Sequence, residues 1–244
     1  AVLDRLPLKA RPRIEAGSSR PLESRSRPRP NPGVDLLIEQ ARGHAPDDRL
    51  VVLVLGAATD VASALLVDPT WADRVEIVAI GFDRWPEGGD PWNVKNDVAA
   101  WQVLLGSRAP IVVGDIAVTR RHLKMDAAQA NALLSDRGEA GRSLSTLLQG
   151  WLATHGDEAA AETGDRSIVP VWDEVAVAYL LGLVETKTHP RPALRADGTF
   201  DHERPRGTIT WVSTIDADRL WADLGRRLER AGRRDRPGSP AGRL

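Results

Sequence analysis

The middle third of the chain alternates aliphatic runs with segments of helical periodicity, and this alternation strongly limits the folds open to it. Aliphatic runs cover residues 50–55, 75–80 and 110–114, and apolar residues at helical spacing occupy residues 60–67 and 98–105 between them. Uninterrupted aliphatic runs are typical of strands that are buried on both faces, as in parallel sheets. The sequence therefore predicts an α/β fold, a Rossmann-like three-layer arrangement with a mostly parallel central sheet flanked by helices.

The rest of the chain predicts more helices and an added pair of strands. Helical spacing recurs in five more segments, residues 34–41, 126–134, 141–154, 173–181 and 216–229. Strands are expected at residues 183–186 and 208–213, paired as a hairpin around the turn at Asp197 and Gly198. Residues 156–164 are polar and predict a loop that joins two of the helices.

The near-balance of charge argues against a nucleic-acid partner. The 244 residues include 33 Lys or Arg and 34 Asp or Glu, for a formal net charge of −1. A nucleic-acid-binding domain normally carries a basic field. The Arg-rich stretches at residues 20–29 and 226–236 offer an alternative polyanion surface, but the balanced charge favours their being solvated segments.

Residue types that are absent exclude further classes. Without cysteine the chain has no disulfide, no thiolate metal site and no Cys nucleophile. No apolar run reaches transmembrane length, so no membrane partner is expected. No secretory signal is visible, which favours a cytoplasmic location, although the chain begins with Ala and a leader ahead of it stays open. The length suits one domain, expected over residues 1–231, before a disordered Arg/Gly/Pro tail over residues 232–244.

Polar clusters follow the predicted strands, at the edge of the sheet where ligands of open α/β folds bind. The fullest cluster is the loop over residues 89–97, which follows the second aliphatic run. Its Asp90, Trp92 and Asn93 offer acceptors, an amide donor and a flat apolar face, a set that suits a sugar or a nucleoside. The competing interpretation is that Asp90 caps the next helix and Asp97 is a solvated charge.

Two smaller clusters carry similar alternatives. Thr59 and Asp60 follow the first aliphatic run, and they either cap the next helix or present polar atoms to a ligand crevice. Asp173 follows Trp172 and either caps a helix or aims its carboxylate at a metal or a sugar hydroxyl. No histidine pair has metal-site spacing, and the motifs of serine hydrolases, P-loop triphosphatases and zinc peptidases are missing from the sequence.

Taken in order, these clusters resemble the inosine-uridine preferring nucleoside hydrolase family. The family's Gly-Pro-Leu-Thr-Asn turn, which follows a core strand, is matched by residues 56–60, and its Glu-Phe-Asn loop is matched by residues 91–93. Its later His-Asp pair, which precedes a helix, is matched by residues 172–173. Residues 15–22 resemble its Ala-Gly-x-x-Arg-Pro-Leu segment, so the likeness spans most of residues 1–230.

The resemblance implies hydrolysis of the N-glycosidic bond of a ribonucleoside, through an oxocarbenium-like transition state. It implies a small nucleoside or ribose as the ligand, a possible homo-oligomer, and a bound Ca²⁺ that holds the ribose hydroxyls and the attacking water. If the roles of the matching family positions hold here, the carbonyl of Thr59 and the carboxylate of Asp173 would be Ca²⁺ ligands. The expected substrate contacts are Asn93 on the ribose, Trp92 and Trp172 stacked on base or sugar, and Asp90 in place of the family's sugar-binding Glu.

The chain also departs from the family pattern. The family begins with a strand that carries an Asp-x-Asp-x-x-x-Asp-Asp cluster, the source of most metal ligands and of the general base, and residues 1–49 hold no such cluster. The fold would then lack the family's first strand-helix units. Trp172 replaces the His that helps the leaving group. We therefore expect a weak Ca²⁺ site and a polypeptide that is nearly inactive alone, or, alternatively, a non-catalytic module that binds ribose or a nucleoside or serves as a scaffold.

Overall fold

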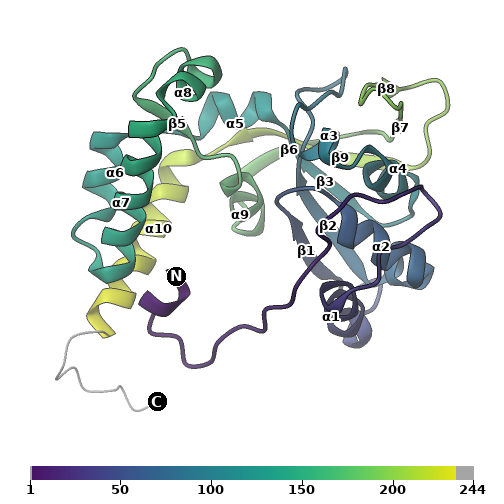
Figure 1. Cartoon of the computed structure of the whole chain (residues 1–244), viewed down its shortest axis with the longest axis horizontal. Helices are drawn as coiled ribbons and strands as arrows, with labels where there is room; N and C mark the ends of the chain where they lie inside the picture. The colour runs from purple at the N-terminus through teal and green to yellow at the C-terminus, as the bar shows by residue number, and fades with distance from the viewer. Residues whose placement is uncertain (1, 235–244) are drawn as a thin grey trace. The chain divides into compact units, whose positions relative to one another are not determined.

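The computed structural model describes residues 2–234, which group into two compact units (Figure 1). The larger unit comprises Ile14–Thr119 and Trp172–Ile215, and the smaller unit takes its described residues from Ala1–Arg13, Arg120–Val171 and Asp216–Leu244. Of the predicted C-terminal tail, residues 232–234 continue the last helix, and residues 235–244 lie outside the described residues. No helix in the described part of the chain has the length and apolar character needed to cross a membrane.

The larger unit is built on a five-stranded sheet in the order β1-β2-β3-β9-β6. Its strands are β1 (Leu50–Val54), β2 (Val75–Ile80), β3 (Ile111–Gly114), β6 (Val184–Pro190) and β9 (Thr208–Ile215). The first four strands of that order run parallel, and β6 pairs antiparallel with β9. The structure therefore confirms the mostly parallel α/β sheet and the pairing of the two C-terminal strands.

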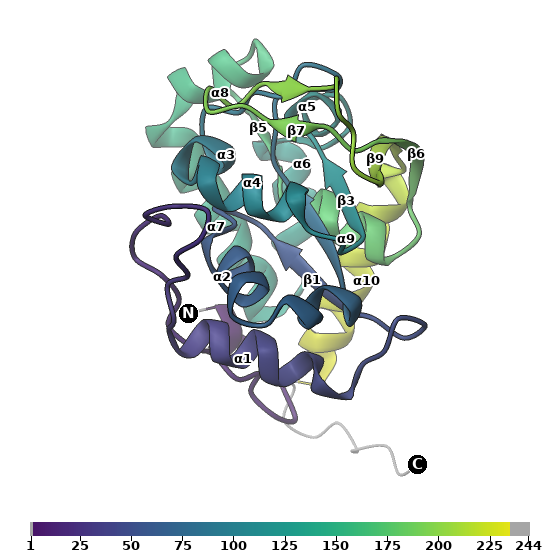
Figure 2. The same ribbon diagram turned by 90° about the vertical axis from the view of Figure 1, so that its right-hand side faces the viewer.

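Helices cover both faces of this sheet. The larger unit contains α1 (Pro32–Gln40), η2 (Ala41–Gly43), α2 (Thr59–Val67), η3 (Pro69–Asp73), α3 (Asn93–Asn96), α4 (Val98–Gly106) and α9 (Glu174–Leu180). Figure 1 shows α1, α2 and α4 on one face and α9 on the other, and Figure 2 shows α2 and α4 in front of the strands. Successive side chains of the strands point to opposite faces of the sheet. Ile77 and Ile111 join the core under α2 and α4, and Val78 and Val112 are buried on the opposite face.

The β6-to-β9 connection contains a second, smaller hairpin that the sequence did not separate from the first. β7 (Ala193–Leu194) pairs antiparallel with β8 (Phe200–Asp201), and the predicted turn at Asp197 and Gly198 closes this small hairpin. Gly198 has a φ of 85°, a conformation that favours glycine at such a turn. The turn was therefore placed correctly, but the strands that meet directly at it are β7 and β8.

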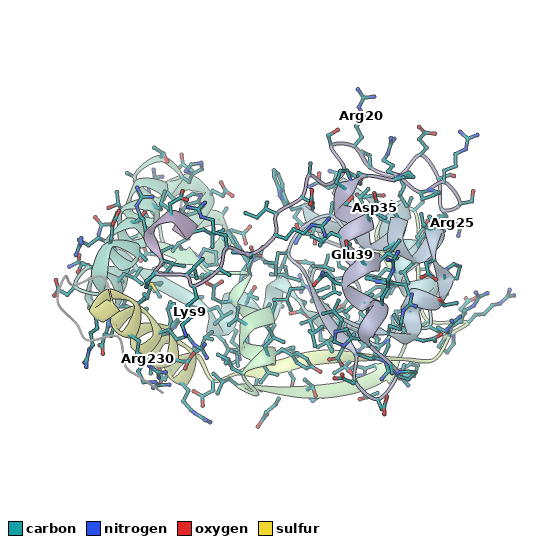
Figure 3. The ribbon with its side chains drawn as sticks, turned by 90° about the horizontal axis from the view of Figure 1, so that it is seen from below. Lys9, Arg20, Arg25, Asp35, Glu39 and Arg230 are labelled. Atoms are coloured by element: carbon teal, nitrogen blue, oxygen red, sulfur yellow. The ribbon has the colours of Figure 1, made fainter. Side chains whose placement is uncertain are left out.

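The N-terminal Arg-rich loop stays in solvent. Asn31 caps α1 by accepting a hydrogen bond from the backbone of Val34, and the helix buries Val34 against the core. Figure 3 shows Arg20 at the tip of the preceding loop, directed away from the protein, and Asp35 and Glu39 along α1. The exposure of Arg20, Arg25 and Arg27 agrees with the interpretation of these residues as solvated, although Leu22 between them is buried in the core.

The smaller unit is mainly helical. It contains η1 (Val2–Arg5), α6 (Ala127–Leu134), α7 (Gly138–Thr154), α8 (Gly156–Thr163), α10 (Ala217–Arg234) and an antiparallel pair, β4 (Lys124–Asp126) with β5 (Ile168–Pro170). Its core includes Met125, Leu134 and Leu228. The division from the larger unit falls within α5 (Ile116–His122).

One predicted loop is a helix in the structure. Residues 156–164 were expected to form a polar loop, but residues up to Thr163 form α8. Three consecutive alanines favour the helix, and Asp157 and Glu158 in the first turn interact favourably with its dipole. Gly164 ends it in a left-handed conformation with a φ of 82°. The prediction was wrong because polarity was given more weight than helix propensity.

Candidate functional site

The carboxyl ends of β1, β2, β3 and β9 lie at one edge of the sheet, called here the carboxyl edge. Ile80 ends β2 and pairs in register with Gly114, which ends β3. Asn93 follows β2 by a loop, but its side-chain amide donates to the carbonyl of Ile80 at 3.0 Å. This bond holds Asn93 directly at the edge, where open α/β sheets bind ligands. The amide oxygen of Asn93 has no hydrogen-bond donor among residues 2–234.

Asp90 organises the loop after β2. Its carboxylate accepts backbone hydrogen bonds from Phe82 at 3.1 Å, Trp92 at 2.6 Å and Val94 at 3.3 Å. The backbone of Phe82 has a φ of 71° and that of Asp90 a φ of 141°, conformations that cost energy and persist only where the surroundings fix them. Burial raises the pKa of the Asp90 carboxyl, although the backbone hydrogen bonds oppose that rise. Asp90 thus holds the loop in place through its backbone donors, one of them Val94 in the first turn of α3, while the residue directly before that helix is Trp92.

Asp97 is a second structural carboxylate. It is only 3% exposed, and it accepts hydrogen bonds from the backbone of Leu22 at 2.8 Å, the hydroxyl of Thr59 at 2.6 Å and the backbone of Ala100 at 2.9 Å. The carboxylate thus joins the N-terminal segment to the starts of α2 and α4. The alternative of a solvated charge at Asp97 is wrong, because the residue is buried and fully engaged.

The Ca²⁺ site implied by the resemblance does not fit the residues as they lie. Thr59 is the first residue of α2, so its carbonyl points along the helix, and it accepts a hydrogen bond from the hydroxyl of Ser63 at 2.8 Å. Among residues 2–234, no three His, Cys, Asp or Glu side chains gather in a way that could hold a metal ion. Of the two predicted ligands, only Asp173 presents a free oxygen.

The start of α9 also lies at the carboxyl edge. Gly114 packs so closely on Val175 that a Cβ built on Gly114 would lie 2.3 Å from a Val175 methyl carbon. At the other end of α9, the hydroxyl of Tyr179 donates to the carboxylate of Glu76, near the start of β2, at 3.2 Å. The helix therefore runs in the direction opposite to that of the strands. Asp173, just before its first residue, is brought to the carboxyl edge.

Asp173 and Glu174 form a pair of carboxylates without partners. Neither side chain has a hydrogen bond or an ion pair among the residues that the structure describes. Surrounding protein atoms desolvate the accessible Asp173 carboxylate and raise its pKa. Burial and then the charge of Asp173 raise the pKa of Glu174. Free carboxylates with raised pKa values at a ligand-binding edge are typical of functional sites.

The two predicted stacking residues differ in exposure. Trp92 is 74% exposed, which leaves the faces of its ring open to a ligand. Trp172, next to Asp173, is half-buried. Both lie in segments that reach the carboxyl edge. An exposed indole there can stack on a base or pack against the apolar face of a sugar.

Asp115 was missed from the sequence, although one signal pointed to it. It directly follows β3, just as the other polar clusters follow their strands at the carboxyl end. Its buried carboxylate accepts hydrogen bonds from the backbone of Val118 at 2.7 Å and the indole of Trp211 at 2.8 Å. Burial raises the pKa of this carboxyl despite those bonds.

The pKa of Asp115 is higher in the folded chain than in the unfolded chain. Its ionisation should therefore lower the free energy of unfolding as pH rises. The folded chain then keeps a proton that the unfolded chain has lost, and stability falls between the ordinary Asp pKa of 3.8 and the raised value. Asp115→Asn cannot ionise. We expect the stability of the intact chain relative to this variant to fall from pH 4 towards neutrality, measured by urea denaturation. A difference that stays constant with pH would contradict the assigned direction.

One known protein family matches most of the chain in sequence. The sequence profile of the family described as Inosine-uridine preferring nucleoside hydrolase matches residues 8–222. A search among curated proteins finds no match.

Solved structures of nucleoside hydrolases share the fold. A plant nucleoside hydrolase has a TM-score of 0.67 and 20% identity, over 83% of this chain and 69% of its own. A purine-preferring ribonucleoside hydrolase from Gardnerella vaginalis has a TM-score of 0.68 and 22% identity, over 84% of this chain and 67% of its own. An inosine-uridine preferring nucleoside hydrolase from Bacillus anthracis has a TM-score of 0.60 and 18% identity, over 83% and 67%.

Proposed function

Because this chain belongs to the inosine-uridine preferring nucleoside hydrolase family, we propose that it binds ribonucleosides at the carboxyl edge and hydrolyses their N-glycosidic bond slowly. The observation that carries this proposal is the free carboxylate pair of Asp173 and Glu174 at that edge. Ribose presents vicinal hydroxyls, and carboxylates that have no protein donor are suited to accept hydrogen bonds from them.

The chemistry of the proposal rests on the chain's own residues. An ionised carboxylate beside the ribose stabilises the positive charge that develops as the glycosidic bond breaks. It also accepts a proton from the attacking water as a general base, while the departing base keeps the electron pair of the glycosidic bond and takes up a proton from solvent. Trp92 stacks on the base and orients the nucleoside. No step passes through Ca²⁺, because the residues do not fit it, and a carboxylate without a metal is a weaker activator of water. Slow turnover follows.

A binding module without turnover is the second candidate. It is favoured because the carbonyl of Thr59 already accepts a hydrogen bond from Ser63 within α2. It is also favoured because no three side chains among residues 2–234 form a cluster that could hold a metal ion. The two candidates share the same ligand and differ only in bond cleavage. A single set of measurements therefore separates them.

The test replaces Asp173 with asparagine, which keeps the size and removes the charge. We expect Asp173→Asn to weaken the binding of uridine and inosine about tenfold in calorimetry, the loss of one charge-assisted hydrogen bond, and to remove the slow release of ribose. Asp47→Asn is the matched control, because Asp47 is exposed and precedes β1 at the opposite edge.

The outcomes separate the candidates. Binding together with ribose release that depends on Asp173 supports the hydrolase. Binding with no release above buffer supports the binding module. Failure of the intact chain to bind either nucleoside, or equal binding by Asp173→Asn and the intact chain, contradicts both candidates at this site.

A further inference from the structure

A cavity of about 500 Å³ lies at the opposite edge of the same sheet, called here the amino edge. It is lined by residues where β3 and β9 begin, including Ile111 and Thr208. Three arginines and no acidic residue line it: Arg108, Arg191 and Arg206. Because β3 and β9 run parallel, this cavity and the carboxyl edge lie at opposite ends of the strands.

Arg191 is a buried cation that has no carboxylate partner among the residues that the structure describes. It is 4% exposed, and its guanidinium donates to three backbone carbonyls, those of Thr208 at 2.9 Å, Ser107 at 2.6 Å and Ala109 at 2.8 Å. Burial lowers its pKa, which reflects the cost of holding the charge away from water. The carbonyls use three of the five N–H donors of a guanidinium, so two are left for a ligand.

The other two arginines add positive charge to the lining of the cavity. Arg108 forms an ion pair with Asp73, both partners being partly exposed. Arg206 is exposed, and its guanidinium has no partner among the described residues. Thr208 and Thr210 also line the cavity and add hydroxyl donors. Of the three arginines in the lining, only Arg108 has a carboxylate partner among the described residues, so the lining carries a net positive charge.

We propose that this cavity binds the phosphate group of a small phosphorylated metabolite, such as a nucleoside monophosphate. Guanidinium groups match phosphate oxygens in a bidentate manner, and hydroxyl donors complete such sites. The volume lies within the range of small-molecule sites, about 300 to 1,000 Å³. A structural role for Arg191 as a clamp on three carbonyls accounts for that residue alone. It does not account for Arg206, which lines the same cavity and whose guanidinium has no partner in the described part of the chain.

The test is calorimetric titration of the full chain with inorganic phosphate, uridine 5′-monophosphate and uridine, at constant ionic strength. We expect both phosphate ligands to bind, and Arg206→Gln to weaken both about tenfold. Stronger binding of the nucleotide than of inorganic phosphate identifies a nucleotide as the ligand, and equal binding identifies the phosphate group alone. Uridine separates this proposal from the nucleoside site, because its binding should be the same in Arg206→Gln.

Arg204→Gln is the matched control. Arg204 is exposed in the same loop, carries the same charge and does not line the cavity. Its replacement should leave phosphate affinity within twofold, and thermal unfolding of both variants checks that they fold. The proposal is overturned if the intact chain binds neither phosphate ligand at millimolar concentration, or if the two variants lose affinity equally.

Discussion

Asp97→Ala should lower the free energy of unfolding by about 4 kcal/mol, because it leaves three buried donors without an acceptor. Those donors are the backbone of Leu22, the hydroxyl of Thr59 and the backbone of Ala100. They belong to segments far apart in the sequence, so the loss weakens the attachment of the N-terminal loop as well as the starts of α2 and α4. Urea denaturation followed by tryptophan fluorescence measures the change.

A graded control tests whether the hydrogen bonds are the cause. Thr59→Val keeps the side-chain shape and removes one of the three donors, so it should cost only about 1 kcal/mol. Asp47→Ala, at an exposed position, should have an effect within about 0.5 kcal/mol. If Asp97→Ala were as mild as Asp47→Ala, the carboxylate would not have the structural role assigned to it.

The fold was largely predictable from the sequence because its central strands β2 and β3 are buried on both faces. The runs that became β1 and β3 are uninterrupted and apolar, the run of β2 is interrupted only by Glu76, and the predicted ends of all three agree with the structure to within one residue. The pattern is informative because a polar residue in these strands faces a packed helix layer and needs a partner there, as Glu76 finds in Tyr179 of α9. Residues 156–164 lack such a pattern, and only propensity and end signals indicated α8.

The candidate site was less predictable, because the role of a polar residue depends on partners distant in sequence. The loop after β2 was correctly placed at the carboxyl edge, but nothing local to Asp97 indicates a bond to Leu22, 75 residues away. The engagement of the Thr59 carbonyl by Ser63 is local and visible only as helix geometry. Asp115 was missed because its partner, Trp211, lies on a strand 96 residues later.

Gly114→Ala should be the clearest test of how the sheet positions the carboxylate pair. Its new Cβ would lie 2.3 and 2.7 Å from the two methyl carbons of Val175, and contacts below 3.0 Å require that something shifts. We expect a loss of about 3 kcal/mol in the free energy of unfolding and a displacement of the start of α9. Because Asp173 and Glu174 lie at that start, nucleoside binding should weaken with it.

Val175→Ala supplies a rescue, since it removes the two methyl carbons at 2.3 and 2.7 Å and leaves only the Val175 Cβ at 3.1 Å from the new Cβ. Alone it should cost about 2 kcal/mol through the space it leaves, and combined with Gly114→Ala it should cost less than the sum of the two changes. Gly43→Ala is the control, because a Cβ there meets nothing within 4 Å. Binding of uridine should return in the double variant. Strictly additive losses would mean that the two residues do not touch, and α9 would then not hold Asp173 at the carboxyl edge in the way the structure describes.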